Sequence, residues 1–581
     1  MVTTANPVCS EQPCEPIRTG AKVTDKAEQT NFGQKWEIVL SAFGSEFVSY
    51  ALNLEPSVAL PGELVGDREG GVSTPRQAAL DALAAVVERV EALLAGEEPQ
   101  AQGGSVAFRR RQMYVSFLCS ASADQECYTD MLHRHCGGLW PDAPVGDDVL
   151  GALYRLGKDV FAACLLRRDA DDRGFGFPPA VTAAMFRSPA TMGVYDAWLA
   201  DPVLSTLFPQ AAEQRKDDQG LYAIQSEFIW STGSGGSLQL AMIPNHVIGY
   251  ALAMMRIEKA FHPAGLLAQL GSALSAVRNL ASRRTIKAPL VVSLSNVIVS
   301  PQNEVRSEHG YLIPADDDLF LNPFPGSEPT AVIVKFVDLK LLDILVRVDS
   351  AEDDSMARRF QHRRDTFDAF RRKEEREVDR LRLGLVLASL EPDLISPVVI
   401  GQAVFNPLSH GSSGIRPPSP YGTPFPAVTI NEPASREIGE WFRRVSEHPE
   451  SMWMGARRLV RAVTDRQDPL DGFIDAVVCW ENMLGSEEGE TVFRVCASLA
   501  VLLEPDTPSL RRELFAELKD LYATRSKLIH GSREPDEGTS GALRDRAVKI
   551  AIKAMKHVYD RPELTESDSS TQRSRILLLG A

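Results

Sequence analysis

Apolar residues recur every three or four positions over much of residues 31–285, which predicts a mainly helical N-terminal region. The clearest helix begins at Thr74-Pro75, because threonine is a favoured N-cap and proline a favoured first helical residue. Its leucines and valines keep helical spacing up to Gly96, a typical helix end. Short apolar runs within residues 36–54 suggest strands instead.

The pattern changes between Pro289 and Val348, where the apolar runs VVSLSNVIV, GYLIP, AVIVKFV and DILVRV alternate with turn residues. Such runs predict a small mixed or antiparallel sheet. The stretch from Glu352 to Leu383 mixes charges of both signs and has few turn residues, so we interpret it as a solvated helix. Its basic half is an alternative nucleic-acid contact. We assign residues 286–404 to a β-rich region plus this charged helix.

Residues 405–435 concentrate Pro, Gly and Ser, which excludes a continuous helix and predicts a linker with a boundary near residue 430. Helical patterns with short connections then fill residues 436–562 and predict an antiparallel helical bundle. The two polar ends, residues 1–30 and 563–581, are expected to be a disordered arm and a flexible tail. The predicted fold class is multidomain, with an α/β (α+β) N-terminal part and an all-α C-terminal bundle.

Length and charge narrow the class of protein. The 581 residues allow about three or four folding units. The formal charge of −16 argues against a protein built to coat nucleic acid, although a local basic site is compatible with it. No apolar run of membrane-spanning length and no secretory signal are visible, and the eight cysteines are dilute. We therefore expect no membrane contact and a reducing, cytoplasmic location.

Two patterns that resemble ligand sites are weak. The glycine-rich STGSGGS lacks the Lys-Ser/Thr of a phosphate-binding loop, so we interpret it as a plain loop. Cys119, Cys127, His133, His135 and Cys136 form the one metal-like cluster, but their spacing matches no zinc pattern. Buried thiols and surface histidines are favoured over zinc there. We expect no metal and no cofactor.

The most informative segment is LYATRSKLIHG, residues 521–531, near the end of a long helical pattern. With the upstream segments IDAVVCWENMLG and ETVFRVCASLAVLLE it resembles the HEPN superfamily, closest to the ApeA-like HEPN domains, over residues 436–560. That resemblance implies a helical bundle, often dimeric, and in many members metal-independent ribonuclease activity with an Arg-x4–6-His motif. Arg525 and His530 match the motif with four intervening residues.

The motif's spacing alone is not specific. Arg256 with His262 and Arg443 with His448 also satisfy it. The match of Arg525 with His530 differs from these two, because it lies in the sequence RSKLIHG and follows an acidic helix with the sequence WENML.

The residue types suit RNA cleavage, because the ribose 2′-OH is a nucleophile built into the substrate and needs no metal. His530 can exchange protons near neutral pH as general base or acid. Arg525 stays charged and its planar fork fits phosphate oxygens, so it can stabilise the phosphorane. By this interpretation Ser526 and Lys527 add phosphate contacts, and Glu481 orients Arg525 or His530.

The competing interpretation is a non-catalytic module. In it Arg525 pairs with an acid such as Glu481, and His530 caps the C-terminal end of its helix, where a cation meets the negative end of the helix dipole. Tyr522 and Leu528 are expected in the core rather than in the site.

Geometry favours a dimer. Five residues of an ideal helix turn through about 140 degrees, so Arg525 and His530 do not share one face. Two protomers that meet across a groove would solve this, and the family's dimers favour it. Apolar positions available for such a homodimer of the C-terminal bundle are Val477, Trp480, Leu484, Leu499 and Leu503.

The sequence thus predicts a metal-independent endoribonuclease of the HEPN type, with RNA as substrate. By resemblance it acts in anti-phage defence or another stress-triggered RNA cleavage. The N-terminal part would be the sensor of an unidentified trigger. The alternative is a non-catalytic HEPN dimerisation or binding module in a regulatory protein.

Overall fold

The computed structural model describes most of the chain: residues 25–55, 59, 74–95, 106–120, 126–167, 179–214, 226–232, 235–316, 319, 329–345, 354–409, 413–415, 425–486, 490–531 and 535–580. The chain forms two compact units, one of residues 1–103, 128–139 and 165–167, and a second of the remainder. This division differs from the boundary predicted near residue 430. Most of the predicted N-terminal arm lies outside the described residues, and a helix already begins at Asp25.

The first unit is helical, with α1 (Asp25–Phe43), α2 (Ser45–Leu52), α4 (Pro75–Ala95) and α6 (Tyr128–His135). The strands predicted within residues 36–54 are wrong. Trp36, Val39 and Phe43 of α1 are buried at spacings of three and four, which is a helical face, and Phe47 is buried in α2. The predicted start of α4 is confirmed, because the Thr74 hydroxyl accepts a hydrogen bond from the Gln77 amide at 3.2 Å and the Gln77 side chain accepts one from the Thr74 amide at 3.0 Å.

The second unit begins with helices, as predicted for this region. They are α5 (Val106–Tyr114), α7 (Asp148–Leu165), α8 (Pro179–Arg187), α9 (Ala190–Ala200), α10 (Pro209–Gln214), α11 (Ile243–Glu258) and α12 (Pro263–Ala281). The stretch Leu240–Glu258, which includes α11, is the one described helix long and apolar enough to cross a membrane by length and composition, but 67% of it is buried inside the protein. Burial of this extent is typical of a core helix.

The predicted β-rich region forms an antiparallel six-stranded sheet in the order β10-β9-β3-β7-β6-β5. Its strands are β3 (Ile286–Ser295), β5 (Val305–Ser307), β6 (Gly310–Pro314), β7 (Ala331–Leu339), β9 (Val398–Val404) and β10 (Ser413–Ile415). A three-stranded sheet has the order β2-β1-β8, from β1 (Ser226–Ser231), β2 (Gly235–Gln239) and β8 (Leu341–Leu345). Short β4 (Val297–Ile298) pairs in parallel with β11 (Val428–Thr429).

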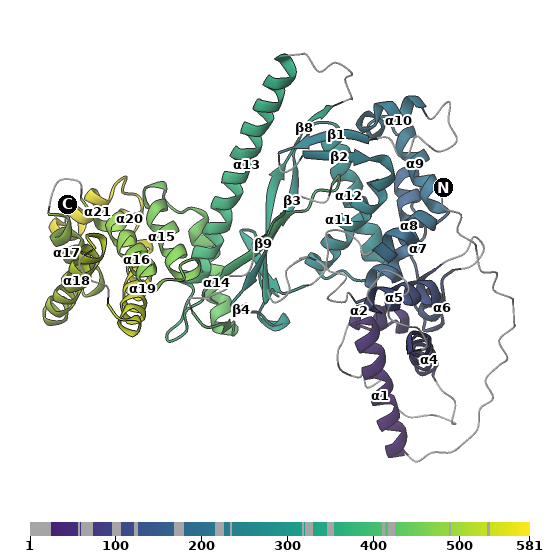
Figure 1. Cartoon of the computed structure of the whole chain (residues 1–581), viewed down its shortest axis with the longest axis horizontal. Helices are drawn as coiled ribbons and strands as arrows, with labels where there is room; N and C mark the ends of the chain where they lie inside the picture. Colours follow the sequence, from purple (N-terminus) through teal and green to yellow (C-terminus); the bar gives the residue numbers. More distant parts are fainter. Residues whose placement is uncertain are drawn as a thin grey trace. The chain divides into compact units, whose positions relative to one another are not determined.

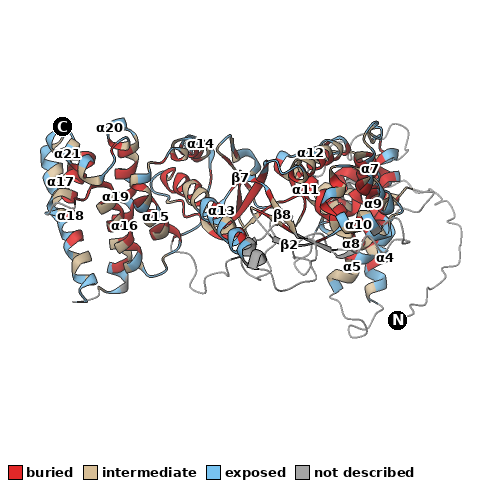
Figure 2. Ribbon diagram, turned by 90° about the horizontal axis from the view of Figure 1, so that it is seen from above, coloured by how far each residue is buried: buried red, intermediate tan, exposed pale blue. Residues whose placement is uncertain are grey.

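Helices cover both faces of the six-stranded sheet (Figure 1). On one face α11 contributes Ala253 and Ile257 to a buried cluster with Val291, Val332 and Val334 of the sheet. The predicted charged helix is α13 (Asp354–Leu387), and it lies on the opposite face, where its Glu377 carboxylate is 3.6 Å from Lys335 Nζ of β7. Much of the N-terminal half of α13 is exposed, whereas residues 381–388 are all buried (Figure 2).

The described parts of residues 405–435 are tied to the sheet rather than forming a separating linker. β10 and β11 extend the sheets, and the Asn296 and Asn303 side-chain amides donate hydrogen bonds of 2.7 and 2.8 Å to the carbonyls of Phe425 and Ile430. The next helix starts at Glu432, after the N-cap Asn431. Proline and glycine exclude a helix here but do not prevent edge strands.

The C-terminal part is an all-α bundle, as predicted. Its helices are α14 (Glu432–Ser446), α15 (Trp453–Thr464), α16 (Pro469–Leu484), α17 (Thr491–Leu503), α18 (Pro508–Ile529), α19 (Glu537–Tyr559), α20 (Pro562–Thr565) and α21 (Ser570–Leu579). α16 is central and packs against α15, α17, α19 and α21. The predicted flexible tail is wrong, because α20 and α21 are folded onto the bundle and Arg573 of α21 is fully buried.

Candidate functional site

Arg525 lies on the last two turns of α18 and pairs with Glu481 of α16. Its Nη2 is 3.3 Å from Glu481 Oε2, and both side chains are about a fifth exposed, at 22% and 23%. The Tyr522 hydroxyl donates a hydrogen bond to the other carboxylate oxygen of Glu481. The structure therefore brings together Arg525 and Glu481, as the sequence predicted, and adds Tyr522, which we had expected only in the core.

Burial sets the electrostatics of this trio. Desolvation raises the pKa of Tyr522, and the hydrogen bond to the Glu481 carboxylate and its negative charge raise it further. The phenol thus stays protonated and keeps donating to the carboxylate. Arg525 Nε is buried and has no hydrogen-bond partner in the described part of the chain. Because Nε has no contact with solvent, only the outer guanidinium nitrogens of this partly exposed side chain can reach a ligand.

His530 ends α18. Its backbone N–H bonds to the Ser526 carbonyl at 3.2 Å, and Gly531 follows with φ of +66°, a left-handed conformation that glycine adopts readily. The imidazole is exposed, and among the described residues it has no hydrogen bond or ion pair. Within one chain, the side chains of His530 and Arg525 therefore make no direct contact. This agrees with the helix geometry, which predicted that the two residues do not share one face.

The two auxiliary residues differ in exposure. Ser526 is half-buried one turn before His530, and Lys527 is exposed to solvent. Positions four apart share a helix face, so Ser526 lies on the same side of α18 as His530. Lys527 places a cation on the surface of α18 two residues after Arg525.

The other two Arg–His matches have structural roles. Arg256 pairs with Asp316 at 3.1 Å, and His262 caps α12 by accepting a hydrogen bond from the Gly265 amide. His448 is 4% exposed, its Nδ1 is 2.5 Å from the Tyr559 hydroxyl, and burial lowers its pKa to about 4. Neither histidine resembles the exposed imidazole of His530.

The structure does not bring the cysteine–histidine cluster together: among the described residues no three potential metal ligands converge. Cys119, Cys127 and Cys136 are buried cysteines outside any disulfide. His133, expected at the surface, is instead 4% exposed and stacks on Tyr50 with ring centroids 4.3 Å apart. Burial lowers the pKa of His133, so it is a neutral core residue.

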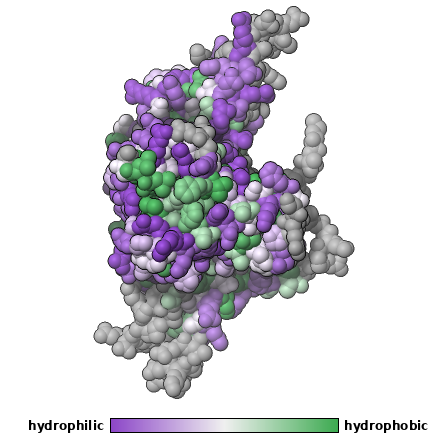
Figure 3. All heavy atoms as spheres, turned by 90° about the vertical axis from the view of Figure 1, so that its left-hand side faces the viewer, coloured by the Kyte–Doolittle hydropathy of each residue, from purple (hydrophilic) through white to green (hydrophobic). Residues whose placement is uncertain are grey.

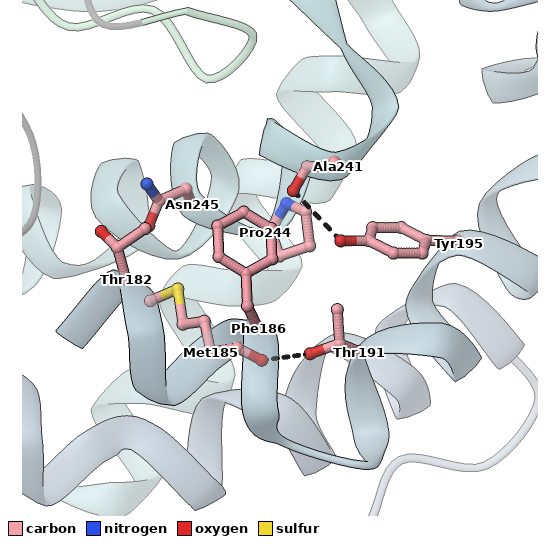
Figure 4. A pocket seen from close by; sticks show the side chains of 8 residues that line it. All are labelled: Thr182, Met185, Phe186, Thr191, Tyr195, Ala241, Pro244 and Asn245. Atoms are coloured by element: carbon pink, nitrogen blue, oxygen red, sulfur yellow. Dashed lines mark hydrogen bonds between the residues drawn. The ribbon is translucent and has the colours of Figure 1, made fainter. Parts of the chain in front are cut away.

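A small pocket lies between α8, α9 and α11 (Figure 4). It has about 180 Å³ of empty space, part of it open to solvent, which is less than typical ligand pockets contain. Two hydrogen bonds join residues that line the pocket. The Tyr195 hydroxyl donates to the Ala241 carbonyl, and the Thr191 hydroxyl donates to the Met185 carbonyl. We do not assign a ligand to it.

Comparisons with known proteins do not identify a family. No protein-family model, curated protein or solved structure matches the chain.

Proposed function

We propose that the protein is a metal-independent endoribonuclease of the HEPN type, with Arg525 and His530 as its catalytic residues. The observation that carries the proposal is the contrast at the end of α18. Arg525 is held by Glu481 yet its side chain stays 22% exposed, and His530 is exposed without a side-chain partner in the described chain. The residues at the other two Arg–His spacings have structural contacts instead.

The chemistry follows from these side chains. A neutral His530 takes the proton of the ribose 2′-OH, the O2′–P bond forms, and the P–O5′ bond breaks. The leaving O5′ takes a proton from an imidazolium, and the products are a 2′,3′-cyclic phosphate and a 5′-OH. Arg525 stabilises the charge that develops on the phosphoryl oxygens, a role for which its delocalised fork is suited.

A second candidate function is a non-catalytic dimerisation or binding module. The Arg525–Glu481 pair favours it, because that interpretation predicted this pair and the position of His530 at the helix end. The two functions differ in one testable respect. Only a nuclease cleaves RNA, and only that cleavage would require the His530 imidazole.

The exposed apolar surface of the bundle favours a homodimer, but through residues other than those predicted. Val477, Trp480, Leu484 and Leu499 are fully buried in the core of one chain, so they cannot form an interface, whereas Leu503 is half-buried. Hydrophobic side chains instead gather on the end of the molecule formed by α17, α18 and α21 (Figure 3). We call this surface the α17–α21 patch. Its exposed members are Val492, Phe493, Leu510 and Leu579.

The helices that carry the patch pack on one another. The rings of Phe493 on α17 and Phe515 on α18 pack edge to face at 5.8 Å, and α21 packs on α17. Exposed apolar surface of this kind marks an interaction site. We propose that a second copy binds at this patch and that Arg525 of one chain and His530 of the other act on one phosphate in the resulting dimer.

The wider role follows from the resemblance. In this proposal the nuclease works in the cytoplasm in anti-phage defence or stress-triggered RNA cleavage, and the N-terminal helices and sheets sense an unidentified trigger.

The test compares purified wild type with His530→Ala on RNA in the presence of EDTA. We expect wild type to cleave RNA to 2′,3′-cyclic or 3′-phosphate ends, to leave DNA intact, and to keep its activity under chelation. Products with 5′-phosphate ends, loss of activity in EDTA, or equal activity of the variant would reject the mechanism.

A further inference from the structure

Tyr522 and Arg525 reach Glu481 from the same side of α18. They are three residues apart, so they share one face of the helix. The Tyr522 hydroxyl donates a hydrogen bond to Oε1 of Glu481, and Arg525 Nη2 donates one of 3.3 Å to Oε2. Each oxygen of this carboxylate therefore has its own donor, and two contacts on different oxygens fix the plane of the group.

Tyr522 is the inner member of the trio. It is 7% exposed, whereas the side chains of Glu481 and Arg525 are 23% and 22% exposed. The Tyr522 ring also lies beside the guanidinium of Arg525, whose central carbon is 5.8 Å from the ring centroid. Burial and the Glu481 carboxylate raise the pKa of the phenol, so its hydroxyl stays a donor at neutral pH.

Glu481 binds Arg525 through one contact only. Nε and Nη2 form one edge of a guanidinium, and a carboxylate often bonds both nitrogens of such an edge with its two oxygens. Here Glu481 bonds Nη2 alone, because its Oε1 accepts from Tyr522, and Arg525 Nε has no partner among the described residues. A carboxylate freed from Tyr522 would turn Oε1 towards Nε and bind Arg525 at two points.

We propose that Tyr522 is a positioning residue, which holds Glu481 so that the carboxylate orients Arg525 through one contact and leaves its outer nitrogens to a phosphate. The inference rests on the proposed function, because it concerns how Arg525 meets the substrate of that site. Arg525 stabilises developing charge only when its outer nitrogens face the phosphoryl oxygens. A two-point pair with Glu481 draws the guanidinium towards the carboxylate and away from the substrate.

Tyr522→Phe tests this role, since it removes one oxygen and keeps the ring. We expect kcat on RNA to fall about ten- to hundred-fold, the range for a hydrogen bond to a charged group. KM should change little, because the added charge on the phosphate develops only in the transition state. In a Glu481→Gln background the same substitution should have little further effect, because a neutral amide cannot form the two-point ion pair.

Tyr559→Phe is the matched control. It removes a hydroxyl that contacts His448 in the same bundle, and it should keep kcat. Activity is measured per folded protein, so that a loss of stability is not counted as a loss of turnover.

The position of Arg525 is also measured without cleavage. Phenylglyoxal modifies accessible guanidinium groups, and peptide mass spectrometry follows its reaction with Arg525. Tyr522→Phe should slow this modification, and Tyr522→Phe/Glu481→Gln should restore it. Arg512, exposed on the same helix, should react at one rate in every variant.

Three results would overturn the inference and leave the proposed nuclease intact. They are full activity of Tyr522→Phe when wild type cleaves RNA, equal losses of kcat in the two Glu481 backgrounds, and unchanged modification of Arg525. The expected modification pattern in a wild-type protein that does not cleave RNA would instead retain the positioning of Arg525 and reject the nuclease.

Discussion

His530 and His448 place the same imidazole in opposite surroundings. His530 is exposed at the end of α18, and its ring is available to a ligand. His448 is 4% exposed, contacts Tyr559 and packs edge-on against Trp453 at 6.1 Å. A histidine that does proton transfer must reach substrate and exchange protons near neutral pH, which burial denies to His448.

Substitution should therefore separate catalysis from stability. We expect His530→Ala to lower turnover on RNA by about 10²- to 10⁴-fold with little change in thermal stability. His448→Ala should lower the unfolding temperature, because it leaves a cavity beside Tyr559, while the folded fraction keeps its turnover. Activity is measured per folded protein, with circular dichroism melts alongside.

His262→Ala is a further control. It removes the N-cap of α12 and should cost about 1 kcal/mol of stability without an effect on turnover. Equal losses of turnover in all three variants would show that the Arg525–His530 assignment is wrong.

Arg525→Lys is expected to fail although it keeps the charge. A lysine ammonium cannot bond Glu481 and also present a planar fork to phosphate. Turnover should fall to near the level of Arg525→Ala, with RNA binding largely retained. A fully active lysine variant would assign Arg525 a role as a point charge only.

At the scale of the element, α13 carries a buried carboxyl group. Glu374 is 7% exposed, its Oε1 has no hydrogen-bond partner in the described residues, and burial together with the charge of Glu375 raises its pKa to about 8. The unfolded chain releases this proton near pH 4.5, and the folded chain keeps it up to about pH 8. Stability therefore falls as the pH rises between these values.

Glu374→Gln should remove this loss. The amide resembles the protonated acid, so the variant should be more stable than wild type at pH 8, by up to about 5 kcal/mol, and similar to it at pH 4.5. Urea unfolding from pH 6.5 to 8 isolates the effect, because the lowered pKa of His448 acts only below about pH 6.5. Glu513→Gln, the same substitution at an exposed position of α18, is the matched control. Parallel pH profiles for wild type and Glu374→Gln would refute the prediction.

Arg573 anchors the last helix. It is fully buried and donates hydrogen bonds to the carbonyls of Met483, Ser567 and Asn482 at 2.7, 3.0 and 3.2 Å, and to the Ser451 hydroxyl. Burial lowers its pKa to about 10, so it is still charged at neutral pH. α21 is thereby joined to α16 and to the segment before α15.

Arg573→Met should leave these carbonyls without a donor. We expect a loss of about 3 kcal/mol in urea unfolding and faster proteolysis within residues 570–579. Lys549→Met, at an exposed position of α19, should change neither. A tail that stays protected from protease in Arg573→Met would show that apolar packing alone holds α21.

At the scale of the whole molecule, the proposed site needs two chains. Phe493 and Leu579, 56% and 74% exposed, are the most exposed members of the α17–α21 patch. Phe493→Glu/Leu579→Glu should give a monomer by sedimentation and reduce RNA cleavage, because charges cannot be buried in an apolar interface without cost. Val145→Glu, which alters a side chain 99% exposed elsewhere, should preserve the dimer and the activity.

Mixing protomers tests whether the site is shared. Heterodimers of Arg525→Ala and His530→Ala chains should recover part of the activity, because one interface then holds an intact Arg525 and an intact His530. Wild-type activity should also fall on dilution below the dimer dissociation constant. A monomer with full activity, or confirmed heterodimers without recovery, would exclude the shared site.

Sequence reasoning worked where the signal is local. Three features depend only on neighbouring residues, and the elements that they mark were predicted. They are the capped start of α4, the apolar runs separated by turn residues in the sheet, and the helical spacing of apolar residues in the bundle. The pairing of Arg525 with Glu481 was also predicted, but from a resemblance and not from physical spacing. The short runs at residues 36–54 failed, because short apolar runs fit strand and helix alike.

Tertiary structure decided what the pattern leaves open. Periodicity marks Val477, Trp480 and Leu484 as an apolar face but does not say whether the same chain or a second one covers it, and here the chain's own core does. The polar tail is another example, because α21 packs on the bundle through Arg573. The hydrogen-bond acceptors of Arg573 include the carbonyl of Met483, more than eighty positions away, as well as that of nearby Ser567. The sequence by itself determined the helices, the sheet and the candidate chemistry, since these depend on local spacing and residue type. Which surfaces are buried depends on contacts between distant segments, and only the folded chain brings those segments together.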